Sequence, residues 1–165
     1  MNRFRIFALL SLCWMIVIFA YSAKNAERST KDSNEIVEII GEIVVEDFDE
    51  LPPEEKQEFI DKTDHIVRKM AHGLEYTLLG VLLLNAGLGL KNRKKWLVAL
   101  VSLVIGSAYA ASDEIHQLFV PGRAGMVTDW MIDTGGVIFG IIMVLVTGLI
   151  ITAVKGGKHE HDTGM

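Results

Sequence analysis

The chain has 165 residues, of which 50% are hydrophobic, with a formal net charge of −5 and one cysteine. Long uncharged stretches alternate with an acidic segment and short basic ones, a pattern typical of a one-domain membrane protein rather than of a soluble or disordered chain. The acidic balance excludes nucleic acid as a partner, because neutralising phosphates takes many Lys and Arg side chains. The lone Cys13 excludes an intramolecular disulfide and a cysteine metal cage.

Four segments meet or approach the length of about 20 mainly apolar residues that crosses a bilayer as a helix. They are residues 4–21, 70–90, 96–120 and 130–154. We therefore predict an all-α, polytopic membrane protein with four transmembrane helices, forming one membrane domain over residues 1–154. The first segment could be a signal peptide cleaved near Ser22, but its apolar run exceeds the usual length of about 7–15 residues, so we expect it to be retained.

Basic residues predict which ends of the spans face the cytoplasm. They lie before the first span, between the second and third, and after the fourth, at Arg3, Arg5, Lys91, Arg93, Lys94, Lys95, Lys155 and Lys158. Both termini are therefore predicted to be cytoplasmic, which agrees with an even number of spans. Residues 155–165 are predicted to form a disordered cytoplasmic tail.

The predicted outer segment, residues 24–68, carries 14 Asp and Glu against 6 Lys and Arg. Residues 32–35 read as a capping box, and apolar residues at helical spacing follow it at Ile36, Ile39, Ile40, Ile43 and Val44. A second short helix is predicted to begin at Pro53, and Thr63 or Asp64 to cap the second span. The segment is either an acidic loop whose apolar stripe rests on lipid headgroups or on the bundle, or a lid over a site.

The ionisable residues within the predicted spans fall at their outer ends. At a rise of about 1.5 Å per residue, Glu75, Asp113 and Asp133 lie roughly 6–10 Å inside the outer boundary of their spans. An ionised side chain at the bilayer centre costs about 2.5–3.5 kcal/mol, so these residues are predicted to face one another around a small polar chamber open to the outer leaflet. Small residues that permit close helix approach are Ser102, Gly106, Ala110, Gly136 and Gly140.

Two kinds of chemistry are predicted in this chamber. Carboxylates in different environments can act as acid and base while histidines move protons, so the catalytic candidates are His72, Glu75, Glu114, His116 and Asp133. An arginine can hold a phosphate or carboxylate in bidentate fashion, so the substrate-binding candidates are Arg123 with Lys69, Tyr76, Asp113, Gln117 and Asp129. Plainer roles also fit: Lys69 and Arg123 as interfacial anchors, His72 with Glu75 as a structural pair, and Asp129 as a helix cap.

A divalent metal is an open variant of this hypothesis. Zn²⁺ or Mn²⁺ would accept two histidines together with two or three carboxylates, here His72, His116, Glu75, Asp113, Glu114 and Asp133. No local spacing in the sequence demands an ion, so no metal is firmly implied. The sequence also has no nucleophile elbow, P-loop or HExxH motif, which leaves the reaction class open.

Two blocks of polar residues at the span ends carry a family resemblance. The second span opens with Arg68-Lys69-x-x-His72-x-x-Glu75-Tyr76, and the third ends with Asp113-Glu114-x-His116-Gln117-x-Phe119-Val120-Pro121-Gly122-Arg123, followed by Asp129 and Asp133-x-x-Gly136. With Ser22 after the first span, this pattern resembles the VanZ-like family of bacterial membrane proteins over roughly residues 4–150. The chain departs from it at the end of the first span, where the family often has Gln after Ser-Ser or Phe-Ser and this chain reads Tyr21-Ser22-Ala23-Lys24.

The resemblance implies an integral protein of the bacterial cell membrane with an envelope-related function. The family is named for a protein that confers resistance to the glycopeptide teicoplanin, and the resemblance supplies no reaction. We weigh an intramembrane enzyme acting on lipid-linked or cell-wall substrates against a non-catalytic protein that binds or shields glycopeptide or a cell-wall precursor. A proton-coupled transporter is disfavoured, because the predicted inner half offers no polar path beyond Asn85, Ser102 and Ser107.

Overall fold

The computed structural model describes residues 2–23, 36–121 and 125–162, with side chains described as far as residue 155. These ranges contain helices and connecting turns and no strand, so the all-α prediction is confirmed for them. The elements are α1 (Arg3–Ser22), a short helix over residues 36–44, the 3-10 helix η1 (Phe48–Glu50), α3 (Pro53–Leu88), α4 (Lys95–Gln117) and α5 (Val127–Asp162).

Three helices are long and apolar enough to cross a membrane. They are Arg3–Ser22, Lys95–Gln117 and Val127–Lys155, which correspond to the first, third and fourth predicted spans. Helix α3 contains the predicted second span but is not one of the three, since His72, Glu75 and Asn85 interrupt its apolar half. The second span, and with it the count of four, therefore stays a prediction, as does the orientation of the chain.

Helix α3 is one continuous helix of 36 residues, not a short outer helix followed by a separate span. It begins with Pro53 at its first position and an acidic first turn, as the sequence predicts. The predicted cap at Thr63 or Asp64 is wrong, because the chain stays helical through both residues. The carboxylate of Asp64 instead pairs within the helix with the guanidinium of Arg68 at 2.8 Å.

The predicted amphipathic helix of the outer segment forms over residues 36–44 but buries an unexpected face. Val37 is fully buried, and Gly41 lies so close to the Phe48 ring that a Cβ there would be 2.5 Å from it. The absence of a side chain at Gly41 thus admits Phe48, whereas the apolar stripe is largely exposed at Ile36, Ile39, Ile43 and Val44. Contact of that stripe with lipid headgroups stays a prediction. The capping box at residues 32–35 lies outside the described residues.

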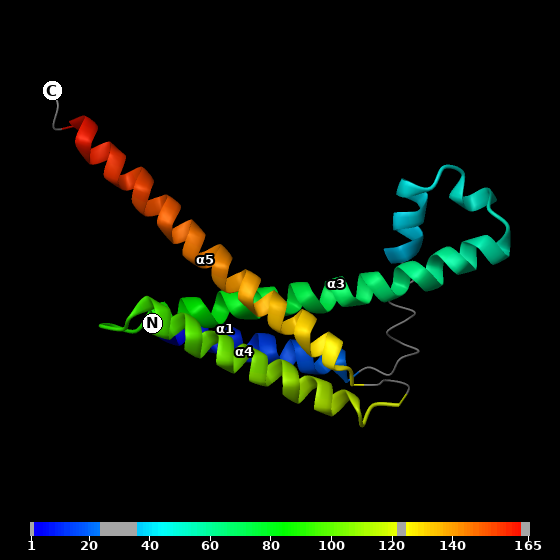
Figure 1. Cartoon of the computed structure of the whole chain (residues 1–165), viewed down its shortest axis with the longest axis horizontal. Coiled ribbons are helices and arrows are strands. Elements are labelled where there is room, and N and C mark those ends of the chain that lie inside the picture. Colours follow the sequence, from blue (N-terminus) through cyan, green and yellow to red (C-terminus); the bar gives the residue numbers. More distant parts are fainter. Residues whose placement is uncertain (1, 24–35, 122–124, 163–165) are drawn as a thin grey trace.

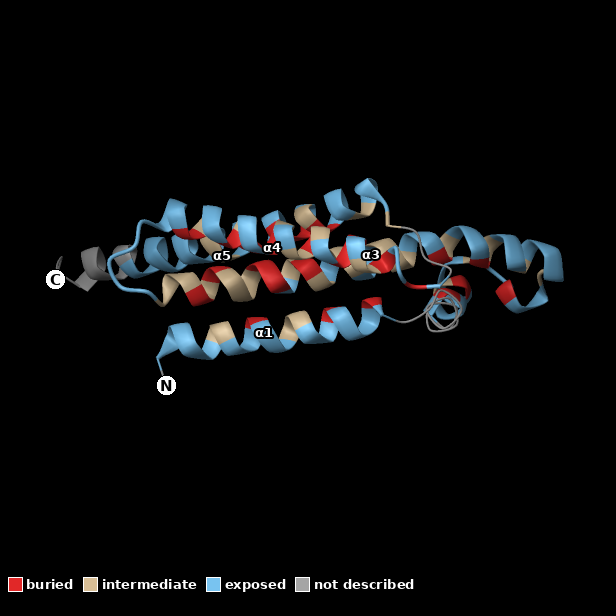
Figure 2. Ribbon diagram, turned by 90° about the horizontal axis from the view of Figure 1, so that it is seen from below, coloured by how far each residue is buried: buried red, intermediate tan, exposed pale blue. Residues whose placement is uncertain are grey.

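Helix α3 lies at the centre of the bundle and contacts α1, α4 and α5. Buried residues follow its middle and the facing sides of its neighbours (Figure 2). The apolar core is formed by Ile18, Tyr76, Leu79, Leu84, Val98, Ala110, Val137 and Ile141. Helix α5 crosses α3 and continues beyond the other helices (Figure 1). It remains helical to Asp162, whereas we predicted disorder from residue 155, and no proline interrupts this stretch.

Small residues bring α5 against α3, as the sequence predicts. A Cβ on Gly136 would collide with the backbone oxygen of Gly73, and one on Gly140 with that of Thr77. Gly106 of α4 lies against the side chain of Val137 in the same way. Close backbone approach at small residues is a common means of packing helices in membranes, where burial of apolar surface offers little driving force. The crossing fixes the first half of α5, which carries Asp133, against α3.

Candidate functional site

Polar residues are buried at the end of the bundle where α4 ends and α5 begins. Five of them form what we call the polar cluster, namely Tyr76, Asp113, Glu114, Gln117 and Asp133, none more than 8% exposed. They come from α3, α4 and α5, as predicted from the position of ionisable residues in the spans. Helical spacing explains the convergence, since Asp113 and Gln117 are four residues apart and share a face of α4.

Asp133 is the most deeply buried carboxyl of the polar cluster, with 1% of its surface exposed. Neither of its oxygens has a hydrogen-bond partner among the described residues. The carboxyls of Glu114, Asp113 and Asp129 are close enough to repel its negative charge. Burying a polar group without a hydrogen bond costs free energy, and burying an unpaired charge costs more. The structure therefore holds an acidic group where packing alone would favour an apolar one.

Tyr76 faces the same space from α3. Its side chain is fully buried, and its hydroxyl also has no hydrogen-bond partner within the described part of the chain. Both Asp113 and Asp133 act electrostatically on this hydroxyl. A phenol is a hydrogen-bond donor as well as an acceptor. The polar cluster thus holds an unused donor on α3, the Tyr76 hydroxyl, and an unused acceptor on α5, the Asp133 carboxyl.

Ser22 joins the polar cluster from the end of α1. The side-chain amide of Gln117 donates to the Ser22 hydroxyl at 3.1 Å and to Asp113 Oδ2 at 3.4 Å, while Asp113 Oδ1 has no partner among the described residues. Ser22 is 1% exposed. In the sequence Ser22 is part of the family-like pattern, but no role in the site was predicted for it. The sequence signal that could have identified Ser22 is its position as a small hydroxyl residue at the end of an apolar run.

Glu114 has a contact that the sequence did not predict. Its Oε2 accepts a hydrogen bond from the backbone N–H of Met126 at 2.8 Å, just before α5. The side chain thus connects the end of α4 to the start of α5. A cavity of about 210 Å³ adjoins it, lined also by Leu118, Gly125 and Trp130. Glu114 is thus a member of the polar cluster that also lines this cavity, so it can both position α5 and meet a group that enters from the side.

Four further predicted residues, Lys69, His72, Glu75 and Asp129, lie at the rim of the cluster. Lys69 Nζ pairs with Asp129 Oδ1 at 3.1 Å, joining α3 to the first turn of α5, and both side chains are partly exposed. His72 Nδ1 lies 3.9 Å from Glu75 Oε2, which fits the structural-pair interpretation and leaves both side chains about one quarter exposed. A rim of this kind would present charged groups to a headgroup above a buried acid.

His116 packs against α1. Its ring lies 4.5 Å from that of Phe19, centroid to centroid. Its Nε2 is buried and has no hydrogen-bond partner among the described residues. Arg123 lies outside the described residues, so its predicted role is untested. Within the described ranges, no three His, Cys, Asp or Glu side chains are grouped so that they could hold a metal ion.

Comparison with known proteins identifies one family. A family model described as VanZ/LLP1 matches residues 7–150, which includes all of α4 and the whole polar cluster. Comparison with curated proteins gave no match, and comparison with solved structures gave none either. The matched region begins within α1 and ends within α5, so it spans the helices that build the cluster.

Proposed function

Because the chain belongs to the VanZ/LLP1 family, we propose that it is a multi-pass protein of the bacterial cell membrane whose polar cluster acts on a lipid-linked or cell-wall substrate. The observation that carries the proposal is the Asp133 carboxyl, buried in an apolar bundle with both oxygens unpartnered among the described residues. Ionisable residues inside membrane segments are costly, and those that persist usually mark a functional site. The substrate would enter from the outer leaflet, in line with the predicted orientation.

Proton transfer is the chemistry that this arrangement supports best. Neighbouring carboxyls that repel one another share protons as a group, so one can donate a proton while another accepts one. In the proposed mechanism Asp133 and Glu114 exchange protons with the substrate, and Tyr76 donates a hydrogen bond to an oxygen on which charge develops. His72 and His116 would move protons between the cluster and water.

Substrate binding falls to the rim in this proposal. Lys69 is held by Asp129 at the start of α5, and Arg123 follows α4 in sequence. A basic group at the rim of an acidic chamber suits the phosphate of a lipid-linked precursor, because charge-assisted hydrogen bonds to phosphate are strong and directional. We also propose that the protein contributes to teicoplanin resistance, as the family's name suggests.

The Glu75→Gln, Glu114→Gln and His116→Ala variants are each expected to remove teicoplanin protection with little loss of membrane insertion. Removing a general acid or base typically costs about 10²–10⁴-fold in rate, so protection should fall to that of cells without the protein. Glu114→Gln keeps a side-chain oxygen that can accept from Met126 N–H, which preserves the start of α5. The measurement is the inhibitory concentration of teicoplanin for cells that contain equal amounts of each variant in the membrane.

Glu58→Gln is the matched control for the two glutamate variants. Glu58 lies on the same helix as Glu75, in its outer part, and pairs only with the exposed Lys62 in the described contacts. Its replacement should leave protection at the wild-type value. If the Glu75→Gln, Glu114→Gln and His116→Ala variants also kept full protection, the site would be structural and the enzymatic proposal would be rejected.

A non-catalytic shielding function is the alternative, and the outer helix favours it. Ile39 and Ile43 are exposed on the helix over residues 36–44, which leaves an apolar face available to a glycopeptide or a cell-wall precursor. Under this alternative Ile39→Ser and Ile43→Ser would remove protection, whereas Glu114→Gln would not. The enzymatic proposal requires the opposite result, so one set of strains separates the two.

A further inference from the structure

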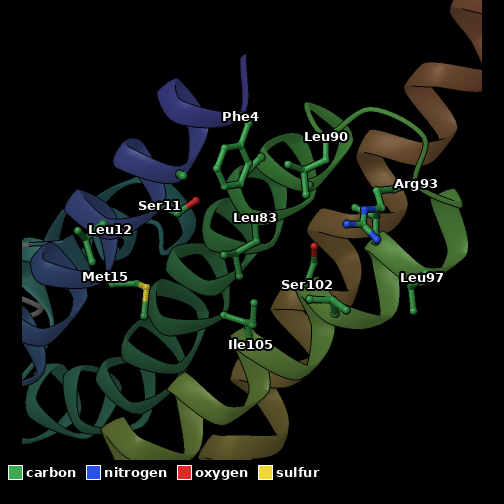
Figure 3. A pocket seen from close by; sticks show the side chains of 15 residues that line it. Phe4, Ser11, Leu12, Met15, Leu83, Leu90, Arg93, Leu97, Ser102 and Ile105 are labelled. Carbon is green, nitrogen blue, oxygen red and sulfur yellow. The ribbon is translucent and has the colours of Figure 1, made fainter. Parts of the chain in front are cut away.

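A second cavity lies in the bundle away from the polar cluster, between α1, α4 and the end of α3. It encloses about 440 Å³. Figure 3 shows its walls, with Phe4 and Met15 from α1, Leu83 from α3, and Leu97 and Ile105 from α4. Ligand pockets fall in this size range and are mostly apolar with a few polar groups. Two of the helices that form it, α1 and α4, are apolar enough to cross a membrane, so hydrocarbon chains surround this region in a bilayer.

Few polar side chains line the cavity, and its one charged side chain among the described residues is positive. Arg93 lies at its border, with its guanidinium turned toward Ser102 (Figure 3). No acidic residue lines the cavity in the part of the chain that the structure describes. The Ser11 hydroxyl donates to the backbone oxygen of Phe7 at 2.8 Å, so it is already satisfied within α1. The walls therefore suit an apolar occupant, and the border suits an anion.

Neighbouring basic residues add positive charge at the border of the cavity. Lys91, Lys94 and Lys95 lie next to Arg93 in and after the connection between α3 and α4, and all four are exposed. Arg3 at the start of α1 hydrogen-bonds Asn85 of α3 at 2.6 Å, which adds another cation at this end. Basic clusters at the end of membrane helices attract anionic lipids, and basic pockets between helices hold their headgroups.

We propose that this cavity binds one acyl chain of an anionic phospholipid, with the lipid phosphate held at Arg93. The apolar walls favour an acyl chain, because the atoms that line an empty cavity lack dispersion contacts that an acyl chain would provide. Arg93 accounts for the headgroup, since its fork of N–H donors matches a phosphate. The site is separate from the polar cluster and does not depend on the function proposed for that cluster.

The test is native mass spectrometry of the full chain in mild detergent, titrated with dioleoyl phosphatidylglycerol or dioleoyl phosphatidylcholine. Because the acyl chains are identical, the two lipids differ only in their headgroups. The wild type should retain one phosphatidylglycerol per chain about fivefold more tightly than phosphatidylcholine, the effect of one basic residue near a membrane surface. Arg93→Gln should lose this preference and still retain either lipid at the weaker affinity.

Two cavity-filling variants test the acyl-chain site from opposite walls. Val101→Phe fills it from α4 and should abolish the retained lipid, whereas Val104→Phe, at another exposed position of the same helix outside the cavity lining, should bind as the wild type does. Ala8→Phe fills the cavity from α1, with Ala20→Phe as its control. Elution as a single species with unchanged helical circular dichroism identifies the folded variants.

Four results would overturn the proposal. The first three are equal binding of the two lipids by the wild type, an unchanged headgroup preference in Arg93→Gln, and wild-type lipid retention by folded Val101→Phe and Ala8→Phe. Loss of lipid in the control variants as well as in the cavity variants would also overturn it, because binding would then be spread over the whole bundle surface. Tight lipid lost only from the cavity variants supports the site.

Discussion

The Asp133→Asn variant is expected to lose the proposed teicoplanin protection while the protein stays at least as stable as the wild type. An asparagine has nearly the same shape but no charge, so it ends the repulsion from Glu114 and Asp113 and cannot donate or accept a full proton. Because the carboxyl lacks hydrogen-bond partners in the described structure, its replacement breaks no such contact there. The measurement pairs the inhibitory teicoplanin concentration with the midpoint of thermal unfolding in detergent.

A functional role and a structural role of Asp133 predict different results. A functional role predicts that protection falls while the midpoint of thermal unfolding does not. A residue kept for packing loses stability when it is changed, whereas a strained functional residue often gains it. Asp61→Asn makes the same chemical change at an exposed position of α3, where the carboxylate accepts only from Gln57 at 2.9 Å in the described contacts, and should alter neither measurement. A lowered midpoint, or full protection, in Asp133→Asn would contradict a functional role for the carboxyl.

Most of the helical framework could be predicted because its signal is local. Apolar runs set the positions of α1, α4 and α5, and polar residues at the ends of these runs indicated where a cluster would form. The bundle brings Asp113 and Asp133 together because helical spacing turns both away from lipid. The cost of exposing a charge to hydrocarbon is large enough to decide this from sequence alone.

The continuity of α3 could not be predicted from the same local signal. Asp64 has the side chain of a helix cap, but such residues also remain inside helices when another partner is at hand. Here Arg68 is that partner, one turn later at 2.8 Å. Capping propensity and a helical ion pair differ by too little free energy for the sequence to distinguish them.

Contacts between helices that are distant in the chain could not be predicted from the sequence either. The Gln117–Ser22 hydrogen bond joins residues 95 positions apart, and it depends on how α1 lies against α4. The face that the outer helix buries likewise depends on Phe48, a residue beyond that helix. In both cases the sequence predicted the helix itself. It did not predict which residue of another element the helix would contact.

The Gly140→Ala variant is expected to be strongly destabilised, although it adds a single methyl group. That methyl would collide with the backbone oxygen of Thr77 and lie 3.0 Å from the backbone N of Val81, and backbone atoms cannot move aside as a side chain can. Overpacking of this kind costs about 1–3 kcal/mol, and rigid neighbours place the expected loss at the upper end. The midpoint of thermal unfolding in detergent measures it.

Gly148→Ala is the matched control, because it makes the same change on the same helix. A Cβ at Gly148 would meet nothing within 4 Å, so the variant should be as stable as the wild type or slightly more stable, since alanine favours the helix. Equal losses in both variants would mean that helix propensity, not the crossing with α3, sets the effect. Gly140 lies seven residues after Asp133 and so shares its face of α5. Displacing the helix at Gly140 should therefore remove protection together with stability, the opposite of the Asp133→Asn pattern.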